Sequence, residues 1–286
     1  MYSHNSKPIS IIDTIRRNTI KLYIIFVSIV ALLVGIGWLI GYFTGDTVTA
    51  VLTSVSLGIV ALWLNYWYSD KLVLVIAGSD VPVDRQLQNI VEELSIAASI
   101  PTPKIRIRVI DNDGANSFSV GRDPQNSTIV VTTGLIKMLT REELSGVIAH
   151  EIAHIKNRDT LVATIAASIT VVSMITPYIA NRMLSNNDSS DHVPGGIMLL
   201  ICGIPLLVLI PFTILLLYFA VGQHREYVAD AMSARLTRHP DALASALEKI
   251  GHFPASMPVI DSLCIVGAAH PPIEERIKRL RSMTAY

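Results

Sequence analysis

The chain has 286 residues, of which 51% are hydrophobic and only 16% are charged. Soluble globular proteins carry about 25% charged residues, so this composition, with a mean hydropathy of +0.48, indicates a membrane protein and excludes a disordered one. Basic and acidic residues balance at 23 each, which argues against nucleic-acid binding because that function needs a basic surface. The two cysteines are too few for a disulfide framework or a thiolate metal cluster, so we expect both to be reduced.

Four apolar stretches divide the sequence, and each is long enough to cross roughly 30 Å of hydrocarbon at about 1.5 Å per residue. They cover residues 22–43, 47–68, 160–180 and 195–222. Short polar turns separate the members of each pair, so we expect two transmembrane hairpins. The first stretch is too long for the apolar region of a signal peptide, and no small-residue cleavage site follows it, so it is expected to be an uncleaved anchor. Aromatic residues collect at the end of the second stretch, as they do at membrane interfaces: Trp63, Tyr66, Trp67 and Tyr68.

Basic residues flank the apolar stretches on one side of the membrane. The N-terminal segment carries several of them, whereas the turn inside the first hairpin carries only Asp46. The other flanking cations are Lys71, Lys156, Arg158 and Arg225. This distribution places both termini and both large polar segments in the cytoplasm. It divides the chain into an N-terminal segment (1–21), a first hairpin (22–68), a polar segment (69–159), a second hairpin (160–222) and a second polar segment (223–286).

The two polar segments together are large enough for one domain, and we expect them to pack together because neither looks self-sufficient. Capping and breaker residues predict helices at 84–99, 140–157, 241–250 and 272–281. Alternating or β-prone runs predict strands at 104–110, 115–120 and 127–132, the last two joined as a hairpin. Thr140 and Glu143 form the pattern of a capping box at the start of the second helix. The result is a small antiparallel sheet with several helices, an α+β domain.

The second of these helices carries the motif HExxH, with His150, Glu151 and His154. Residues four apart share one helix face, so both imidazoles can reach one metal ion. Glu151 lies about 100° round the helix from His150, beside the metal, where it can take a proton from the attacking water. Zinc held in this way makes amide hydrolysis feasible. The alternative is an ordinary surface helix with two histidines, although apolar residues flank the motif where a core-facing helix needs them.

A catalytic zinc needs a third protein ligand, and Glu226 is the best candidate. Glu226 and Asp230 are again four apart on a predicted helix, so Glu226 can bind the metal while Asp230 accepts a hydrogen bond from the second nitrogen of a ligand histidine. Two carboxylates at this spacing are usually only a solvated face. The second hairpin favours the metal interpretation, because it would bring both segments together at one membrane face, with His154 about 9 Å from the hydrocarbon.

Together these motifs resemble the HtpX-type membrane zinc metalloproteases, which are related to the CAAX prenyl proteases. The resemblance rests on HExxH, a following apolar hairpin, REYVAD and the C-terminal AHPPIEERIKRL, with further matches at SDKL (69–72), ANSF (115–118) and TTGL (132–135). It implies an α-helical membrane protein with four transmembrane helices and a cytoplasmic α+β zincin-like metalloprotease domain. It also implies a gluzincin-like endopeptidase that holds one Zn²⁺ per chain on His150, His154 and Glu226, with Glu151 as the base.

Further residues take roles from the resemblance. His270 could donate a hydrogen bond to the developing oxyanion, and Arg276 could orient the substrate backbone or a carboxylate. The alternative for both is a helix N-terminus and a surface salt bridge. Such enzymes commonly bind an extended peptide at a sheet edge, here residues 116–120, where Asn116 could hold the substrate main chain. The pair before REY departs from the family pattern, and its His224 is expected on the surface or, alternatively, near the metal.

The resulting hypothesis is a multi-pass zinc endopeptidase of the cytoplasmic membrane that cuts misfolded or damaged membrane proteins, in quality control and stress response. Its expected partners are protein or peptide substrates and the lipid bilayer, not nucleic acid, and its oligomeric state is left open. A prenyl-protein (CAAX-type) endopeptidase is the main alternative, although four spans are few for the enclosed chamber that it needs. A transporter is disfavoured because the spans contain no ionisable residue, and a non-catalytic scaffold because every proposed catalytic position is filled.

Overall fold

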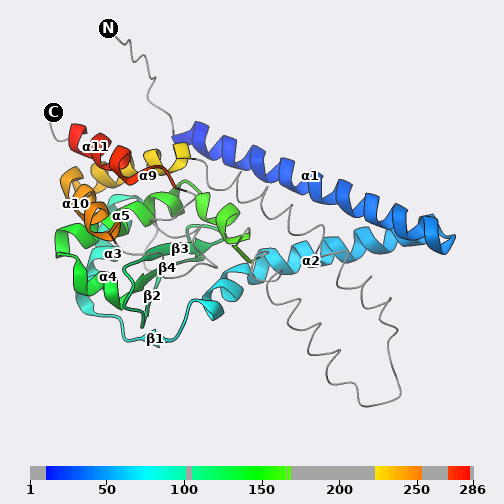
Figure 1. Ribbon diagram of the computed structural model, residues 1–286, viewed down its shortest axis with the longest axis horizontal. Coiled ribbons are helices and arrows are strands. Elements are labelled where there is room, and N and C mark those ends of the chain that lie inside the picture. Colours follow the sequence, from blue (N-terminus) through cyan, green and yellow to red (C-terminus); the bar gives the residue numbers. More distant parts are fainter. Residues whose placement is uncertain (1–10, 101–104, 166, 169–222, 253–269, 284–286) are drawn as a thin grey trace, which may run out of the picture.

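The structure, a computed structural model, describes residues 11–100, 105–165, 167–168, 223–252 and 270–283 (Figure 1). Its first two helices, α1 (Ile11–Thr44) and α2 (Thr47–Ile76), form a hairpin that projects from an α+β domain (Figure 1). The two helices approach closely at Gly37, where an added Cβ would lie 2.6 Å from Cα of Val51. A side chain at this position would push the hairpin apart.

One described helical segment, Val27–Thr44 in α1, is long and apolar enough to cross a membrane. In α2, the parts Thr47–Val60 and Trp63–Ile76 qualify only together, as one span with a bend of 42°. The predicted spans at 160–180 and 195–222 lie outside the described residues, except for a helical stretch at 159–165 and 167–168. The arrangement with four transmembrane helices therefore stays a prediction, as do the domain boundaries drawn from it.

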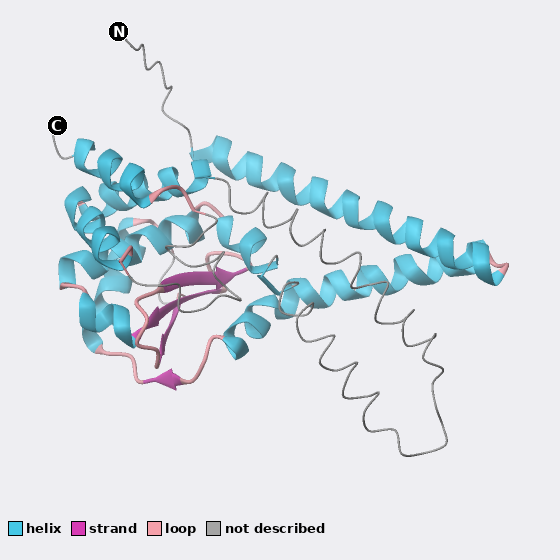
Figure 2. Cartoon of the chain, viewed as in Figure 1, coloured by secondary structure: helices cyan, strands magenta, loops and turns pink. Residues whose placement is uncertain are grey.

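A four-stranded sheet forms the centre of the domain (Figure 2). Its strands lie in the order β1-β2-β4-β3 and are β1 (Asp80–Val81), β2 (Arg106–Ile110), β3 (Ser117–Gly121) and β4 (Ser127–Thr132). β3 and β4 pair antiparallel, as the predicted hairpin requires, and β1 pairs antiparallel with β2.

β2 and β4 run parallel, so the expectation of an antiparallel sheet is wrong. The reason is that the second strand of the hairpin, not the first, lies beside β2, with Arg106 opposite Thr128. The alternation of residues along each strand does not specify which of the two strands takes this place. Because β4 takes the inner position, β3 is the strand at one end of the sheet, with β1 at the other end.

The sheet separates two hydrophobic cores, because alternate residues of a strand point to opposite faces. On one face, Val109, Ile129 and Val131 pack against helices of the domain. The core on the other face joins the strands to the end of α2 and to the helical stretch that follows α5; it consists of Val73, Ala77, Ile110, Phe118, Val120, Val130, Ala163 and Ala167. The last turns of α2 therefore belong to the domain and cover one face of its sheet (Figure 2).

Helices from both polar segments cover the opposite face. The first segment contributes α3 (Arg85–Ala97), α4 (Thr133–Met138) and α5 (Arg141–Lys156); the second contributes α9 (Gln223–Thr237), α10 (Pro240–Ile250) and α11 (Ile273–Met283). α5 contacts both α9 and α10, so the two segments pack together as predicted. The predicted capping box of Thr140 and Glu143 is present at the start of α5. The short elements α4 and β1 have no counterpart among the predicted elements.

Three helices converge at Gly146, one turn before His150. An added Cβ on Gly146 would lie 2.9 Å from the backbone nitrogen of Leu243 in α10. From α9, the hydroxyl of Ser233 donates a hydrogen bond of 2.7 Å to the carbonyl oxygen of Gly146. The absence of a side chain at this position thus allows α5 to lie directly against α10, while its carbonyl group binds α9.

Gly146→Ala should destabilise the domain by about 1–3 kcal/mol, the usual cost of overpacking a core. The added methyl group meets the backbone of α10, which cannot move aside as the end of a flexible side chain can. Thermal unfolding of the detergent-solubilised protein, followed by circular dichroism, measures the effect. The matched control is Ser145→Ala, at a partly exposed position of the same turn. Equal unfolding midpoints for the two variants would contradict this account of the packing.

Candidate metal centre

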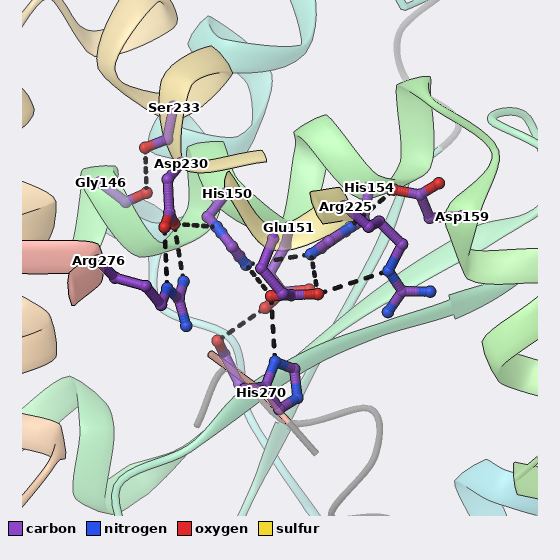
Figure 3. A network of polar contacts seen from close by, with 12 residues as sticks. Gly146, His150, Glu151, His154, Asp159, Arg225, Asp230, Ser233, His270 and Arg276 are labelled. Carbon is purple, nitrogen blue, oxygen red and sulfur yellow. Dashed lines mark hydrogen bonds and ion pairs between the residues drawn. The ribbon is translucent and has the colours of Figure 1, made fainter. Parts of the chain in front are cut away.

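Two helices direct ligating side chains at one buried point (Figure 3). α5 presents His150 and His154 on one face, one turn apart, and α9 presents Glu226. These three side chains can each place one ligand atom within 4.8 Å of the others, and all three residues are buried. The prediction that the two histidines and Glu226 lie together therefore agrees with the structure.

The distances in this cluster fit a tetrahedral metal ion. Zinc bonds to nitrogen and oxygen of about 2.0–2.1 Å place neighbouring ligand atoms about 3.3 Å apart. The Nε2 atoms of His150 and His154 are 3.1 Å apart; Oε2 of Glu226 lies 3.4 Å from that of His150, and Oε1 lies 3.6 Å from that of His154. Oε2 of Glu226 is buried and has no well-aligned hydrogen-bond donor among the described residues. The donor set and its spacing suit a divalent cation.

Each histidine has a carboxylate behind it. Nδ1 of His150 lies 3.0 Å from Oδ1 of Asp230, and Nδ1 of His154 lies 3.1 Å from Oδ2 of Asp159 (Figure 3). A carboxylate at this place holds the proton on Nδ1, so the lone pair is on Nε2. Both lone pairs then face Glu226, an arrangement that is repulsive unless a cation or a proton lies between them.

Charges in the cluster compensate one another. Burial opposes a charge on His154, but the carboxylates of Glu226 and Asp159 outweigh it and raise the pKa of this imidazole to about 9. Burial also opposes ionisation of Glu226, yet the imidazoles of His270 and His154 hold its pKa well below the usual range of a glutamate. In the metal-free protein a proton on His154 therefore balances the carboxylate at neutral pH. Metal binding would release this proton.

Arg276 of α11 is fully buried and binds Asp230 through two hydrogen bonds. Its Nε and Nη2 atoms donate to the two carboxylate oxygens at 2.8 and 2.7 Å. Burial raises the pKa of Asp230, but the guanidinium outweighs it and lowers the pKa to about 2. The expected alternative of a surface salt bridge is therefore wrong, because the pair is buried. Arg276 pairs with Asp230, and its expected role of orienting the substrate backbone or a carboxylate stays a prediction.

Glu151 lies beside the ligands and faces the terminal strand β3. It is buried, and the hydroxyl of Ser117 donates a hydrogen bond of 3.1 Å to its Oε1. Asn116 precedes Ser117 and is also buried; its side-chain oxygen accepts from the backbone nitrogen of Ser117 at 2.9 Å. Asn116 thus adjoins in the chain the residue that contacts Glu151, and its contact with substrate stays a prediction.

His270 also contacts Glu226, with its Nδ1 3.1 Å from Oε2. The structure therefore brings it to the cluster, while its role toward an oxyanion stays a prediction. The side chain of His224 lies outside the described part. Three residues that the sequence patterns did not indicate also contact the cluster: Asp159, Ser117 and Arg225, whose Nε lies 3.4 Å from Oε1 of Glu226.

Comparison with known proteins gives a family and close relatives. A model described as Peptidase family M48 matches residues 83–284. The chain is 36% identical to a Protease HtpX homolog of Caldanaerobacter subterraneus subsp. tengcongensis over 291 residues, which cover 93% of this chain and 96% of that protein. It is 38% identical to a homolog of Dictyoglomus turgidum over 306 residues (97% and 96%), and 34% identical to Protease HtpX of Legionella pneumophila over 291 residues (93% and 99%). Among solved structures, the crystal structure of S. mikatae Ste24p has a TM-score of 0.48 at 20% identity, over 94% of this chain and 66% of that chain.

The family match spans both helices that present the ligand cluster, α5 and α9. The relatives are matched over nearly their whole length, so the similarity includes the apolar hairpin that precedes the domain. A pair of buried imidazoles with a carboxylate and an adjacent glutamate is the chemistry that a metal-dependent peptidase needs. The chain therefore belongs to peptidase family M48 and is a metalloprotease of the HtpX type.

Proposed function

We propose that this protein is a membrane-bound, zinc-dependent endopeptidase, with one zinc ion held by His150, His154 and Glu226. The observation that carries the proposal is a buried cluster in which the Nε2 atoms of His150 and His154 are 3.1 Å apart and one ligand atom of each of the three side chains lies within 4.8 Å of the others. Oε2 of Glu226 has no well-aligned donor among the described residues. Two nitrogens and one oxygen leave a tetrahedral zinc one position for water or substrate.

The bound zinc would polarise the scissile carbonyl and make the attacking water more acidic. Glu151 is the proposed general base. The hydroxyl of Ser117 donates to its Oε1, which fixes the orientation of the carboxylate. Oε2 makes no hydrogen bond among the described residues, so it is the atom that we propose takes the proton from water and returns it to the leaving amine.

Three further polar residues support the ligands in this proposal. Asp230 and Asp159 keep the protons of the two imidazoles on Nδ1, and Arg276 holds Asp230 through its two hydrogen bonds. Arg276 is thus a positioning residue, separated from the ligands by Asp230.

The substrate is proposed to bind as an extended strand beside β3. This strand is terminal in the sheet, so its outer edge can accept a peptide backbone, and its first residue contacts Glu151. Asn116 at its start would hold the substrate main chain. His270, next to Glu226, would donate to the oxyanion that forms on the scissile carbonyl.

The proposed substrates are misfolded or damaged membrane proteins, in a quality-control role on the cytoplasmic side. Support comes from the packing of α2, whose last turns cover one face of the sheet while α5 lies on the other. A domain joined to an apolar hairpin in this way stays close to the bilayer, where segments that leave the membrane are within reach.

Glu151→Gln should slow casein degradation by about 10²- to 10⁴-fold, the usual contribution of a general base, and should leave the metal content unchanged. Glutamine keeps the shape of the side chain but cannot accept the proton. The matched control is Glu142→Gln, on the exposed side of the same helix. Cleavage rates and metal analysis of the purified protein test the prediction, and cleavage at the original rate would count heavily against the mechanism.

Asp159→Asn should weaken zinc binding by about 10- to 100-fold, because the amide lacks the charge that holds the proton on Nδ1 of His154. Glu226→Ala, which removes a ligand, should weaken it further. Competition with a chelator measures the dissociation constants, and Asp113→Asn, with a side chain that is 95% exposed, is the control. If the Asp159 variant binds zinc as tightly as the original protein, the residue does not support the ligand.

A further inference from the structure

A pocket of about 490 Å³ lies where α2 meets the domain, and none of its lining residues belongs to the metal centre. Its wall combines side chains of the last part of α2 with side chains of the sheet and of the loop between β3 and β4. Six of its lining residues are aromatic or cationic: Trp63, Trp67, Tyr68, Lys71, Arg106 and Arg122.

Aromatic rings hold two of these cations in place. The guanidinium carbon of Arg122 lies 4.3 Å from the ring centroid of Trp67. Nζ of Lys71 lies 4.9 Å from the ring centroid of Tyr68. Such contacts favour a cation over the ring face without neutralising its charge. Both cations therefore remain able to bind an anion.

Among the described residues, the carboxylates near the pocket form no ion pair with Lys71 or with the terminal nitrogens of Arg122. Asp70 lines the pocket, but its closest basic group is Arg106, at 3.4 Å. Lys71 has no ion pair among the described residues. Asp123 pairs with Arg122 through Nε, at 3.6 Å, and its carboxylate also accepts hydrogen bonds from Gln125 and Asn126 within its own turn.

The terminal nitrogens of Arg122 make no hydrogen bond within the described part of the chain. Arg122 is nevertheless largely covered, with a side chain that is 23% exposed. A guanidinium with two adjacent donors presents the geometry that a phosphate group accepts. The donors of Arg122 thus suit an anion that carries a phosphate group.

The position of the pocket on α2 indicates where this anion comes from. Val60, Trp63 and Trp67 follow one another at helical spacing, and all three are exposed, by 53%, 59% and 41%. Toward the domain three polar residues follow in the helix, Ser69, Asp70 and Lys71. Tryptophan and tyrosine mark the headgroup level of a bilayer, and basic residues at this level attract anionic lipids.

We propose that this pocket binds the headgroup of an anionic phospholipid. Arg122 and Lys71 bind the phosphate, and the acyl chains extend along the exposed apolar side of α2 at Val60. A free phosphate shares the anionic group but has nothing to place against this apolar surface. This proposal concerns lipid binding and does not depend on the peptidase mechanism.

Native mass spectrometry of the full-length protein in a neutral detergent tests the proposal. Phosphatidylglycerol should be retained in preference to phosphatidylcholine, and an excess of inorganic phosphate should not displace it. Equal retention of the two lipids, or displacement by inorganic phosphate, would overturn the proposal, and this comparison requires no variant.

A pair of variants then assigns the site. Lys71→Gln with Arg122→Gln should reduce the affinity for phosphatidylglycerol by about fivefold for each cation, or about 25-fold together. Arg85→Gln with Lys137→Gln removes the same charge from exposed positions outside the pocket and should have no effect. Trp67→Leu keeps an apolar side chain but removes the support of Arg122, and should also weaken retention. Wild-type affinity in both pocket variants, with unfolding midpoints unchanged, would place the lipid elsewhere.

Discussion

The metal centre depends on the pairing of buried charges, above all that of Arg276 with Asp230. Arg276 has no contact with solvent, and both oxygens of Asp230 accept its hydrogen bonds while the same carboxylate faces Nδ1 of His150. Removing one member of a buried pair leaves an uncompensated charge, at a cost of about 3–5 kcal/mol. The same pair of residues therefore contributes both to the stability of the domain and to the orientation of the His150 imidazole. The last described helix, α11, completes a centre whose ligands come from α5 and α9.

The sheet lies between the centre and the helical hairpin. Its first face supports α5, which carries HExxH, and its second face rests on Val73 and Ala77 near the end of α2. A helix that is apolar on all sides in its first part can thus end as part of a globular core. This arrangement explains how a small domain of two separate chain segments can be fixed relative to the helices that precede it.

Those parts of the fold and site that depend on local signals could be predicted from the sequence. The start of α5 follows from its capping box. The contact of His150 with Glu226 could be predicted because each belongs to a pair of ligating residues four positions apart on its own helix. The parallel pairing of β2 with β4 could not, because it depends on which strand of a hairpin is placed inside. Asp159 and Ser117 lie in a turn and at a strand end, and their contacts with the centre arise only when these segments are positioned in space.

The terminal strand β3 touches different surroundings at its two ends. At its start Ser117 binds Glu151, and beyond its end at Gly121 the next residue, Arg122, lies over the ring of Trp67 in α2. Four steps of about 3.4 Å separate Ser117 from Gly121, a distance of about 14 Å. The same strand thus carries the contact with Glu151 and leads directly to the contact with α2. The position of the Ser117 hydroxyl group therefore depends on how the end of α2 packs against the sheet.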